Sequence, residues 1–458
     1  MKASYLVWFF YSIFFPLIAN SQTIQLPDIE AYRDKWTILR PELDTNIERY
    51  RKGDVAIEVV DENGDPIREA KLVVKQKTHE FLFGCNILWL GQLGEKNELY
   101  ENAFAKLFNL ATTTFCLSEY RLQDGQYRFE EDSKDIFRRP PVDRVLAFGK
   151  KYDIKLKGQP LLADSWHPVW AKDMTTEEAH ELYKDYFKTV ADRYGDDFFM
   201  FDVVNEAFLC EGRNTRRGWD FPLYTDDLSY AGWAFGAAQP LFPKKCILSI
   251  NEATGVNTSE SERYFEFIKN IFNKGCDIDG IGFQFHLFNN ESLKSHIEGK
   301  EFVPSQLIDT YNKFQYFNRP LYITEITIPT TLAKGVEGEK IQAEILSNLY
   351  RLWFSIPAMA GITYWNLCDG VAWKNEGDAK AGLLDEDMLE KPAYQALYQL
   401  IQREWNTRLT TQTNLQGKAD FRGFYGKYDI TVIVEEKSQT FEIDILKGGS
   451  KINRITFK

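Results

Sequence analysis

Cysteine, histidine and surplus positive charge are what this sequence has little of. Its 458 residues include six cysteines and five histidines, with 67 acidic against 55 basic side chains. The histidines do not stand at metal-ligand spacing from cysteine or aspartate, so we expect neither a metal site nor a cofactor. The formal net charge of −12 argues against a nucleic-acid partner, because contacts with phosphates require clustered basic side chains.

The few cysteines lie far apart and do not predict a disulfide framework. Such frameworks are typical of secreted domains much smaller than this chain, although a single disulfide is compatible with the sequence. Four of the six stand inside apolar, strand-like runs, where cysteine packs as a small hydrophobic side chain: Cys85, Cys116, Cys246 and Cys368. With 44% hydrophobic and 15% aromatic residues, the chain can build a large core and also offer rings on which sugars stack.

A long apolar run occurs only at the N-terminus. Residues 1–21 contain one positive charge, an apolar stretch from Tyr5 to Ile18 and a small-residue end, a pattern typical of a secretory signal peptide. The stretch is too short to span a membrane, and no later segment is long and apolar enough to do so. A buried N-terminal helix is the alternative interpretation. We therefore expect a secreted or periplasmic protein without a membrane span.

Beyond residue 80, apolar strand-like runs alternate with helical stretches. The runs are 81–87, 108–115, 156–162, 198–204, 246–250, 280–287, 321–327 and 361–367. The stretch Met174–Gly195 illustrates a connecting helix, because Thr175 and Glu178 form a capping box and apolar residues then recur at helical spacing. Eight such units predict an α/β fold, a (β/α)8 TIM barrel over residues 81–404.

Smaller β elements are expected on both sides of the barrel. Residues 22–80 predict a polar helix, from Leu26 to about Lys52, and then a β-hairpin with its turn at Asn63–Gly64. Residues 405–458 alternate without a helical period and predict a small β module. Pairing between this module and the hairpin is a further hypothesis, because the two ends of a barrel chain can lie close together.

Two of the predicted strands end in glutamates. Glu206 follows the run 198–204 directly after Asn205, and Glu325 stands at the corresponding place in the run 321–327. The carboxyl ends of barrel strands are where such folds expose their active-site groups. Two glutamates there suit glycoside hydrolysis, in which one donates a proton to the leaving oxygen and the other faces the anomeric carbon. The alternative is that each one caps a helix or pairs with an arginine.

Further polar and aromatic side chains are expected beside these glutamates. Gln284 and His286 are two residues apart on the sixth strand and therefore lie on one side of it. Trp365 and Trp373, at and after the eighth strand, can form a floor or wall for a pyranose ring. A single histidine or tryptophan in such a place is often structural, so the prediction depends on their occurring together.

These segments, in this order, resemble glycoside hydrolase family 10, the retaining endo-β-1,4-xylanases. The resemblance covers roughly residues 54 to 402. The segments that match are Asp202–Glu206, Gly282–His286, Ile323–Ile326 and Ile362–Trp365 with Asp369, Gly370 and Trp373, and then Gly382–Asp387 and Lys391–Tyr394. It implies a polysaccharide or oligosaccharide substrate, with xylan as the leading candidate.

The resemblance also implies a role for each residue. Glu206 would be the acid/base and Glu325 the nucleophile, with their carboxyl groups about 5–5.5 Å apart, as in retaining enzymes. Asn205 would hold the 2-hydroxyl of the sugar at the cleavage point. Gln284 and His286 would position that sugar and the nucleophile, while the two tryptophans would shape the pocket.

The second and third strands depart from the family's pattern. Residues 111–120 lack the Glu-Asn pair and the lysine that bind sugars on the non-reducing side. Gln159 stands where a sugar-binding histidine is expected, and Ala163 where a tryptophan is expected, although Trp166 and His167 follow closely and could compensate. Changed hydrogen-bonding groups can redirect specificity. The alternatives are therefore a retaining β-glycosidase for another β-linked glycan or glycoside, or a carbohydrate-binding barrel without turnover.

Overall fold

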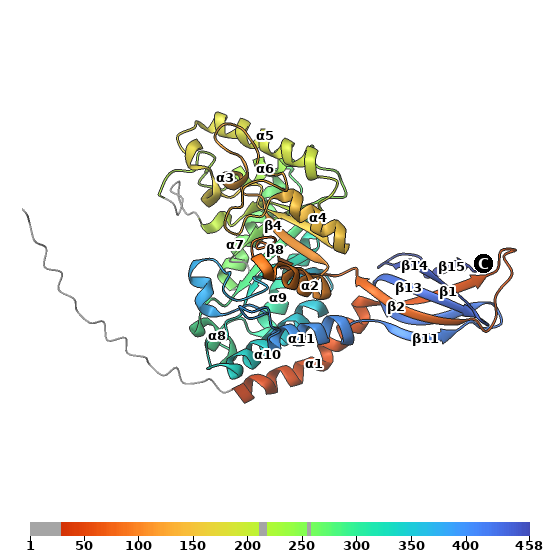
Figure 1. Cartoon of the computed structure of the whole chain (residues 1–458). Coiled ribbons are helices and arrows are strands. Elements are labelled where there is room, and N and C mark those ends of the chain that lie inside the picture. Colours follow the sequence, from red (N-terminus) through yellow and green to blue (C-terminus); the bar gives the residue numbers. More distant parts are fainter. Residues whose placement is uncertain (1–28, 210–217, 254–257) are drawn as a thin grey trace, which may run out of the picture.

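A closed barrel of eight parallel strands forms the larger part of the protein (Figure 1). The computed structural model describes residues 29–209, 218–253 and 258–458, so the predicted signal peptide lies outside the described residues. The barrel strands are β3 (Leu82–Asn86), β4 (Leu110–Thr114), β5 (Lys155–Gln159), β6 (Met200–Asn205), β7 (Ile247–Glu252), β8 (Gly280–His286), β9 (Leu321–Thr327) and β10 (Met359–Tyr364). Each predicted run overlaps one of these strands, which confirms the (β/α)8 barrel.

Helices surround the barrel on its outer side (Figure 1). They are α2 (Asn97–Leu107), α3 (Leu117–Tyr120), α4 (Val142–Tyr152), α5 (Thr176–Tyr194), α6 (Tyr230–Ala238), α7 (Thr258–Asn273), α8 (Asn290–Ile297), α9 (Pro304–Phe314), α10 (Val336–Ser355) and α11 (Pro392–Gln399). The capping box predicted for α5 is present, since Thr175 Oγ1 accepts from Glu178 N and the Glu178 carboxylate accepts from Thr175 N. The residues that recur at helical spacing in α5 are buried, among them Tyr183, Tyr186, Phe187, Val190 and Tyr194.

A two-sheet module stands beside the barrel and combines strands that precede the barrel in the sequence with strands that follow it (Figure 1). Its strands are β1 (Lys52–Val60), β2 (Lys71–His79), β11 (Arg408–Gln412), β12 (Lys418–Phe424), β13 (Gly426–Val434), β14 (Lys437–Ile445) and β15 (Ile452–Thr456). One sheet has the order β12-β1-β15 and the other the order β11-β2-β13-β14. The hypothesis that the two terminal segments pair is therefore confirmed.

The predicted hairpin is wrong, because β1 and β2 belong to different sheets. β1 pairs with β12 and β15, and β2 pairs with β11 and β13. Alternate residues of both strands, such as Ile57 and Val74, are buried in one shared core. A hairpin made of these two strands alone would leave that apolar face in water, whereas two facing sheets cover it.

Helix α1 (Ile29–Arg51) links the barrel to this module. It runs beside α10, where Arg33 forms an ion pair with Glu344 at 2.8 Å. Its last residue, Arg51, is buried, with its guanidinium 4.7 Å from the ring centre of Phe81 and 5.1 Å from that of Phe354. The helix thereby joins the amino-terminal end of the barrel to the first strand of the module.

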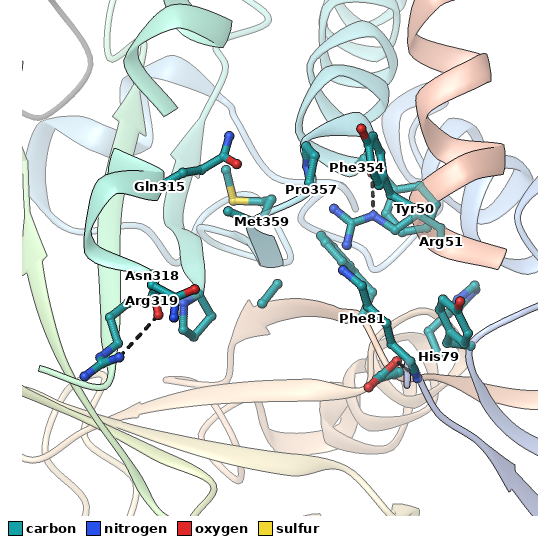
Figure 2. Close-up of a pocket in the computed structure, with 16 residues that line it drawn as sticks. Tyr50, Arg51, His79, Phe81, Gln315, Asn318, Arg319, Phe354, Pro357 and Met359 are labelled. Atoms are coloured by element: carbon teal, nitrogen blue, oxygen red, sulfur yellow. Dashed lines mark hydrogen bonds between the residues drawn. The ribbon is translucent and has the colours of Figure 1, made fainter. Parts of the chain in front are cut away.

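A cavity of about 500 Å³ lies at this amino-terminal end, and Figure 2 shows Arg51 and Phe81 on one side of it and Arg319 on the other. Residues that directly precede three barrel strands line it, namely Phe81, Pro320 and Ala358. Active sites of such barrels lie at the opposite end, where the strands finish. A candidate active site is therefore expected at the carboxyl ends of the barrel strands.

Several features are absent from the part of the chain that the structure describes. No disulfide joins any two of the five cysteines in these ranges, while Cys210 lies outside the described residues. Within the same ranges, no helix has the length and apolar character needed to traverse a bilayer. No three side chains of the types His, Cys, Asp and Glu come together there as a possible metal site.

Candidate active site

A cavity of about 320 Å³ lies at the carboxyl ends of the barrel strands. The last residues of β4, β5 and β6 line it, together with residues of the loops that follow other strands. Six of the eight predicted site residues are in its wall: Gln159, Asn205, Glu206, Glu325, Trp365 and Trp373. The other two, Gln284 and His286, reach the two glutamates from β8.

Glu206 follows β6 with an unusual backbone conformation. Its φ of 57° lies in the left-handed region, which costs a residue with a side chain roughly 1–3 kcal/mol. Its amide N–H donates to Asn251 O at 3.0 Å, and Gln284 Nε2 donates to its carboxyl oxygen Oε1 at 2.9 Å. Strain of this kind is maintained at functional sites, where neighbouring contacts hold it. Here it accompanies a carboxyl group that faces the cavity.

Glu325 lies within β9 and is 5% exposed. Gln159 Nε2 donates to its oxygen Oε1 at 3.0 Å, and Asn251 Nδ2 approaches the same oxygen at 3.4 Å. His286 Nε2 lies 3.4 Å from the other oxygen, Oε2. N–H donors stabilise negative charge on a carboxylate, as an attacking group requires.

The two glutamates are close neighbours in the strand register. Gln284, which donates to Glu206, is the Cα partner of Glu325 in the pairing of β8 with β9. Both carboxyl groups therefore face one cavity, as the sequence predicted. The separation of about 5–5.5 Å that a retaining enzyme needs stays a prediction.

A buried chain of polar side chains orients Gln159. Lys157 on β5 is almost fully buried, and its Nζ lies 2.7 Å from Asp202 Oδ2 on β6. Burial raises the pKa of Asp202, against the opposing charge of Lys157. Lys157 Nζ also donates to Gln159 Oε1 at 3.2 Å. Because an ammonium group only donates, this contact turns the amide NH2 of Gln159 toward Glu325.

Asn251, at the end of β7, is a site residue that the sequence analysis did not identify. Its Nδ2 donates to Asn205 Oδ1 at 2.7 Å, and its Oδ1 accepts the Thr324 hydroxyl at 2.5 Å. Asn205 lines the cavity, and its amide NH2 takes no part in this contact. A signal was present, since Asn251 and Glu252 follow the apolar run 246–250 as Asn205 and Glu206 follow the run 198–204.

The alternation of β8 places its polar side chains toward the site. Phe283 and Phe285 point outward, with ring contacts at 5.3 Å and 5.2 Å to aromatic residues of the surrounding helices. Gln284 and His286 point the other way, as predicted, toward the two glutamates. The second ring nitrogen of His286 lies 2.9 Å from Thr327 Oγ1, which sets the orientation of the imidazole.

Tryptophans form much of the cavity wall. Trp365 follows β10 and is 8% exposed, and Trp373 lies on the next loop. Trp166 also lines the cavity and meets Trp373 edge to face at 6.2 Å. His167 is fully buried, and its ring nitrogens contact Tyr183 Oη at 3.2 Å and a backbone carbonyl at 3.0 Å. Of the two residues that could compensate for changes on the third strand, only Trp166 therefore lines the cavity.

Three charged side chains from two loops also line the cavity: Arg138, Arg139 and Glu376. The sequence did not predict them. Arg138 Nη1 donates to Asn366 Oδ1 at 2.9 Å and to Val371 O at 2.8 Å. Burial lowers the pKa of Arg138 to about 10, which still leaves it charged at neutral pH. Loop residues follow no periodic pattern, so the sequence offered no signal for their position.

Glu252, the last residue of β7, is buried beside the turn that carries Glu206. Its Oε2 accepts from Phe208 N at 3.1 Å and its Oε1 from Ala253 N at 2.8 Å. Burial, and to a smaller extent the charge of Glu206, raises the pKa of Glu252 to about 8, although these N–H donors and Arg263 act against the shift. Glu252 therefore ties the turn to β7 mainly as a protonated acid.

Replacing Glu252 with glutamine is expected to flatten the pH dependence of stability. The folded protein keeps this proton up to about pH 8, whereas the unfolded chain releases it near the ordinary pKa of 4.5. The contribution of protonated Glu252 to the free energy of unfolding is therefore fully present below that ordinary pKa. It is lost as pH rises toward 8, and the loss is on the order of a few kcal/mol. Urea unfolding across this pH range measures the effect. An equal loss in the variant would contradict the assignment.

Solved xylanase structures share the barrel fold. Xylanase 10B from Thermotoga maritima superimposes with a TM-score of 0.56 at 24% identity, covering 71% of this chain and 96% of that one. Xylanase 10B from Thermotoga petrophila RKU-1, solved in complex with xylobiose, gives a TM-score of 0.56 at 23% identity, with coverages of 71% and 95%. At such identity these similarities establish the shared fold.

Curated relatives extend the comparison beyond the barrel. The anti-sigma-I factor RsgI6 of Acetivibrio thermocellus is 24% identical over 413 residues, which are 89% of this chain and 48% of that protein. Endo-1,4-β-xylanase B of Thermotoga neapolitana is 27% identical over 278 residues, covering 58% of this chain and 75% of that enzyme. The chain thus spans less than half of the first relative.

The family assignment follows from a match over most of the chain. The sequence model of glycosyl hydrolase family 10 matches residues 79–400, which contain all eight barrel strands and all eight predicted site residues. This match confirms the resemblance that the motifs around the two glutamates indicated. The chain belongs to glycosyl hydrolase family 10.

Proposed function

We propose that the protein is a retaining glycoside hydrolase that cleaves β-1,4-xylosidic linkages in xylan or xylo-oligosaccharides. The proposal depends above all on one observation: Glu206 and Glu325 face one cavity at the carboxyl ends of the barrel strands, each with an amide donor on its carboxyl group. A two-carboxylate mechanism needs this arrangement.

In the first step Glu325 attacks the anomeric carbon while Glu206 donates its proton to the glycosidic oxygen. The glycosidic bond breaks, and an ester forms between the sugar and Glu325. In the second step Glu206, now a carboxylate, accepts a proton from a water molecule whose oxygen attacks the same carbon. The ester breaks and both glutamates return to their starting states. Two inversions at one carbon retain the β configuration.

The contacts of the site fit these roles. Glu325 accepts N–H groups from Gln159 and Asn251, and His286 Nε2 lies 3.4 Å from its other oxygen, which suits a group that must be ionised to attack. Gln284 donates to Oε1 of Glu206, so the acidic proton is expected on the other oxygen, where it can meet the leaving group. Trp365 and Trp373 offer faces for the sugar ring.

Xylan is the proposed substrate because of the family and the relatives. Several of the similar proteins are endo-1,4-β-xylanases by name, and one solved relative is described in complex with xylobiose. The N-terminal pattern of residues 1–21 supports export through a signal peptide, so we propose a secreted or periplasmic location. Another β-linked glycan or glycoside remains the alternative, since Gln159 binds Glu325 where the family would bind sugar with a histidine.

Turnover of aryl β-xylobioside, aryl β-glucoside and aryl β-galactoside tests this proposal. We expect kcat/KM for the xylobioside to exceed kcat/KM for the other two substrates by at least about tenfold. The reason is that each hydroxyl or methylene that the site does not fit weakens binding of the transition state by about 1–3 kcal/mol. Proton NMR of the fresh product is expected to show the β anomer first. Preference for another glycoside would establish the alternative enzyme, an α product would exclude retention, and binding without turnover would indicate a carbohydrate-binding barrel.

A further inference from the structure

Arg139 places a positive charge on the cavity wall between two tryptophans. It lies between α3 and α4, lines the cavity and is 5% exposed. Its guanidinium carbon is 4.9 Å from the ring centre of Trp166 and 6.0 Å from that of Trp373. Cation–π contacts hold a guanidinium group in place but do not neutralise its charge.

No carboxylate of the described residues pairs with this charge. Arg139 Nη1 donates to the backbone oxygen of Arg138 at 2.9 Å. Its Nε is buried and has no hydrogen-bond partner within the described ranges, and Nη2 makes no hydrogen bond to them either. Burial of a charged group is unfavourable unless an opposite charge or hydrogen bonds compensate it, so an incompletely paired arginine in a cavity wall indicates a missing partner.

Arg33 shows, in the same protein, what an unused N–H group of Arg139 can bind. Arg33 Nε donates to the two carboxylate oxygens of Glu344 at 2.9 Å and 3.1 Å, and its Nη2 donates to one of them at 2.8 Å. In Arg139 neither Nε nor Nη2 has a hydrogen-bond partner among the described residues, and because Nε is fully covered, Nη2 is the group left to meet a carboxylate oxygen in the cavity. A hydrogen bond from a charged guanidinium N–H group to a carboxylate is stronger than one between neutral groups.

We propose that Arg139 binds the carboxylate of an acidic sugar, so that the protein acts on a β-linked glycan that bears uronic acid residues. The inference rests on the proposed glycosidase function, which brings a sugar chain into this cavity. In a uronic acid, a carboxylate takes the place of the CH2OH group of the sugar ring. The faces of Trp166 and Trp373 beside the guanidinium give such a ring an apolar surface to contact.

The other charges of the cavity restrict where the acidic sugar can bind. Glu206, Glu325 and Glu376 line the same cavity and repel a carboxylate that approaches them. Arg138 lies next to Arg139 and adds positive charge, although its own Nη1 is already hydrogen-bonded. The acidic sugar is therefore directed to Arg139, which would orient the neutral backbone of the glycan across the two catalytic glutamates.

The test compares two substrates that differ in one group. The first is a xylo-oligosaccharide with a glucuronic acid substituent, and the second is the same compound with the carboxyl group reduced to an alcohol. We expect kcat/KM of the wild type to be about 10–100-fold higher on the acidic compound, because hydrogen bonds to a charged group contribute about 1.5–3 kcal/mol. Equal kcat/KM on the two compounds overturns the proposal without any variant.

Two variants locate the effect at Arg139. Arg139→Met is expected to lose this advantage on the acidic compound while changing kcat/KM on the reduced compound less than about threefold. Arg139→Lys, which keeps the charge but not the planar guanidinium group, is expected to retain part of it. Arg144→Met is the matched control, because Arg144 lies nearby in the sequence but is paired with Asp135 at 2.9 Å, outside the cavity lining. Equal losses for Arg139→Met on both compounds also overturn the proposal.

Failure of the proposed function gives a different result. If the wild type hydrolyses neither compound nor an aryl β-xylobioside, the glycosidase function is rejected. Titration calorimetry of the wild type with the same two compounds then decides the role of Arg139, since tighter binding of the acidic one supports it and equal or absent binding of both rejects it.

Discussion

Replacing Glu325 with alanine is expected to lower turnover of an aryl β-xylobioside by roughly 10⁴-fold or more. Without this carboxylate, no covalent glycosyl intermediate can form. The fold is expected to persist, because Gln159, Asn251 and His286 each retain another hydrogen bond when Glu325 is shortened. The measurement is kcat on the aryl substrate, together with the thermal unfolding midpoint.

Azide provides a sharper readout for the same variant. A small anion can occupy the space of the missing carboxylate and attack the anomeric carbon directly, so the product is expected to be the α-glycosyl azide. Glu291→Ala, at an exposed glutamate of α8, is the matched control and is expected to retain wild-type turnover. Activity of Glu325→Ala near that of the control would remove Glu325 as the nucleophile.

Replacing Glu206 with alanine is expected to produce a loss that depends on the leaving group. An acid that donates a proton contributes about 10²–10⁴-fold to the rate, so hydrolysis of xylo-oligosaccharides should fall by that factor. An activated aryl group leaves without a proton, so formation of the glycosyl intermediate from a dinitrophenyl β-xylobioside should change far less. Pre-steady-state bursts with the two kinds of substrate separate these steps.

Accumulation of the intermediate distinguishes this variant from a general loss of structure. Because Glu206 also activates the water of the second step, the variant should show a burst of dinitrophenol followed by slow turnover, and azide should accelerate that turnover to give the β-glycosyl azide. Equal losses on both kinds of substrate, with no burst, would contradict the assignment of Glu206 as acid/base.

Local patterns were sufficient to predict the barrel. Runs of apolar residues separated by amphipathic stretches indicate strands that are buried on both faces. Each of the eight predicted runs overlaps a barrel strand. Glu206 and Glu325 could be predicted because a charged residue that interrupts such a run lies at or near the strand end, where parallel barrels collect their functional groups. The family match over residues 79–400 supports the same interpretation.

Pairing between distant segments could not be predicted in the same way. The turn at Asn63–Gly64 favours a hairpin, but β1 and β2 belong to different sheets, and the apolar side chains of both are buried in the core between these sheets. Asn251 and Lys157 were missed for a related reason. Their importance comes from partners on other strands, Asn205 for Asn251 and Asp202 for Lys157, and a separation along the chain of more than 40 residues carries no information about contact.

The sequence by itself determined that eight strands form a barrel and that two glutamates stand at its carboxyl edge, because strand periodicity and abrupt polar endings are local properties. Only the tertiary structure decided how these groups are held: which N–H groups face Glu325, which end of the Gln159 amide faces Lys157, and that Arg139 lies between two tryptophans with no carboxylate partner among the described residues. The physical reason is that hydrogen bonds, burial and charge balance depend on distances in space, and those distances exist only once the chain has closed on itself.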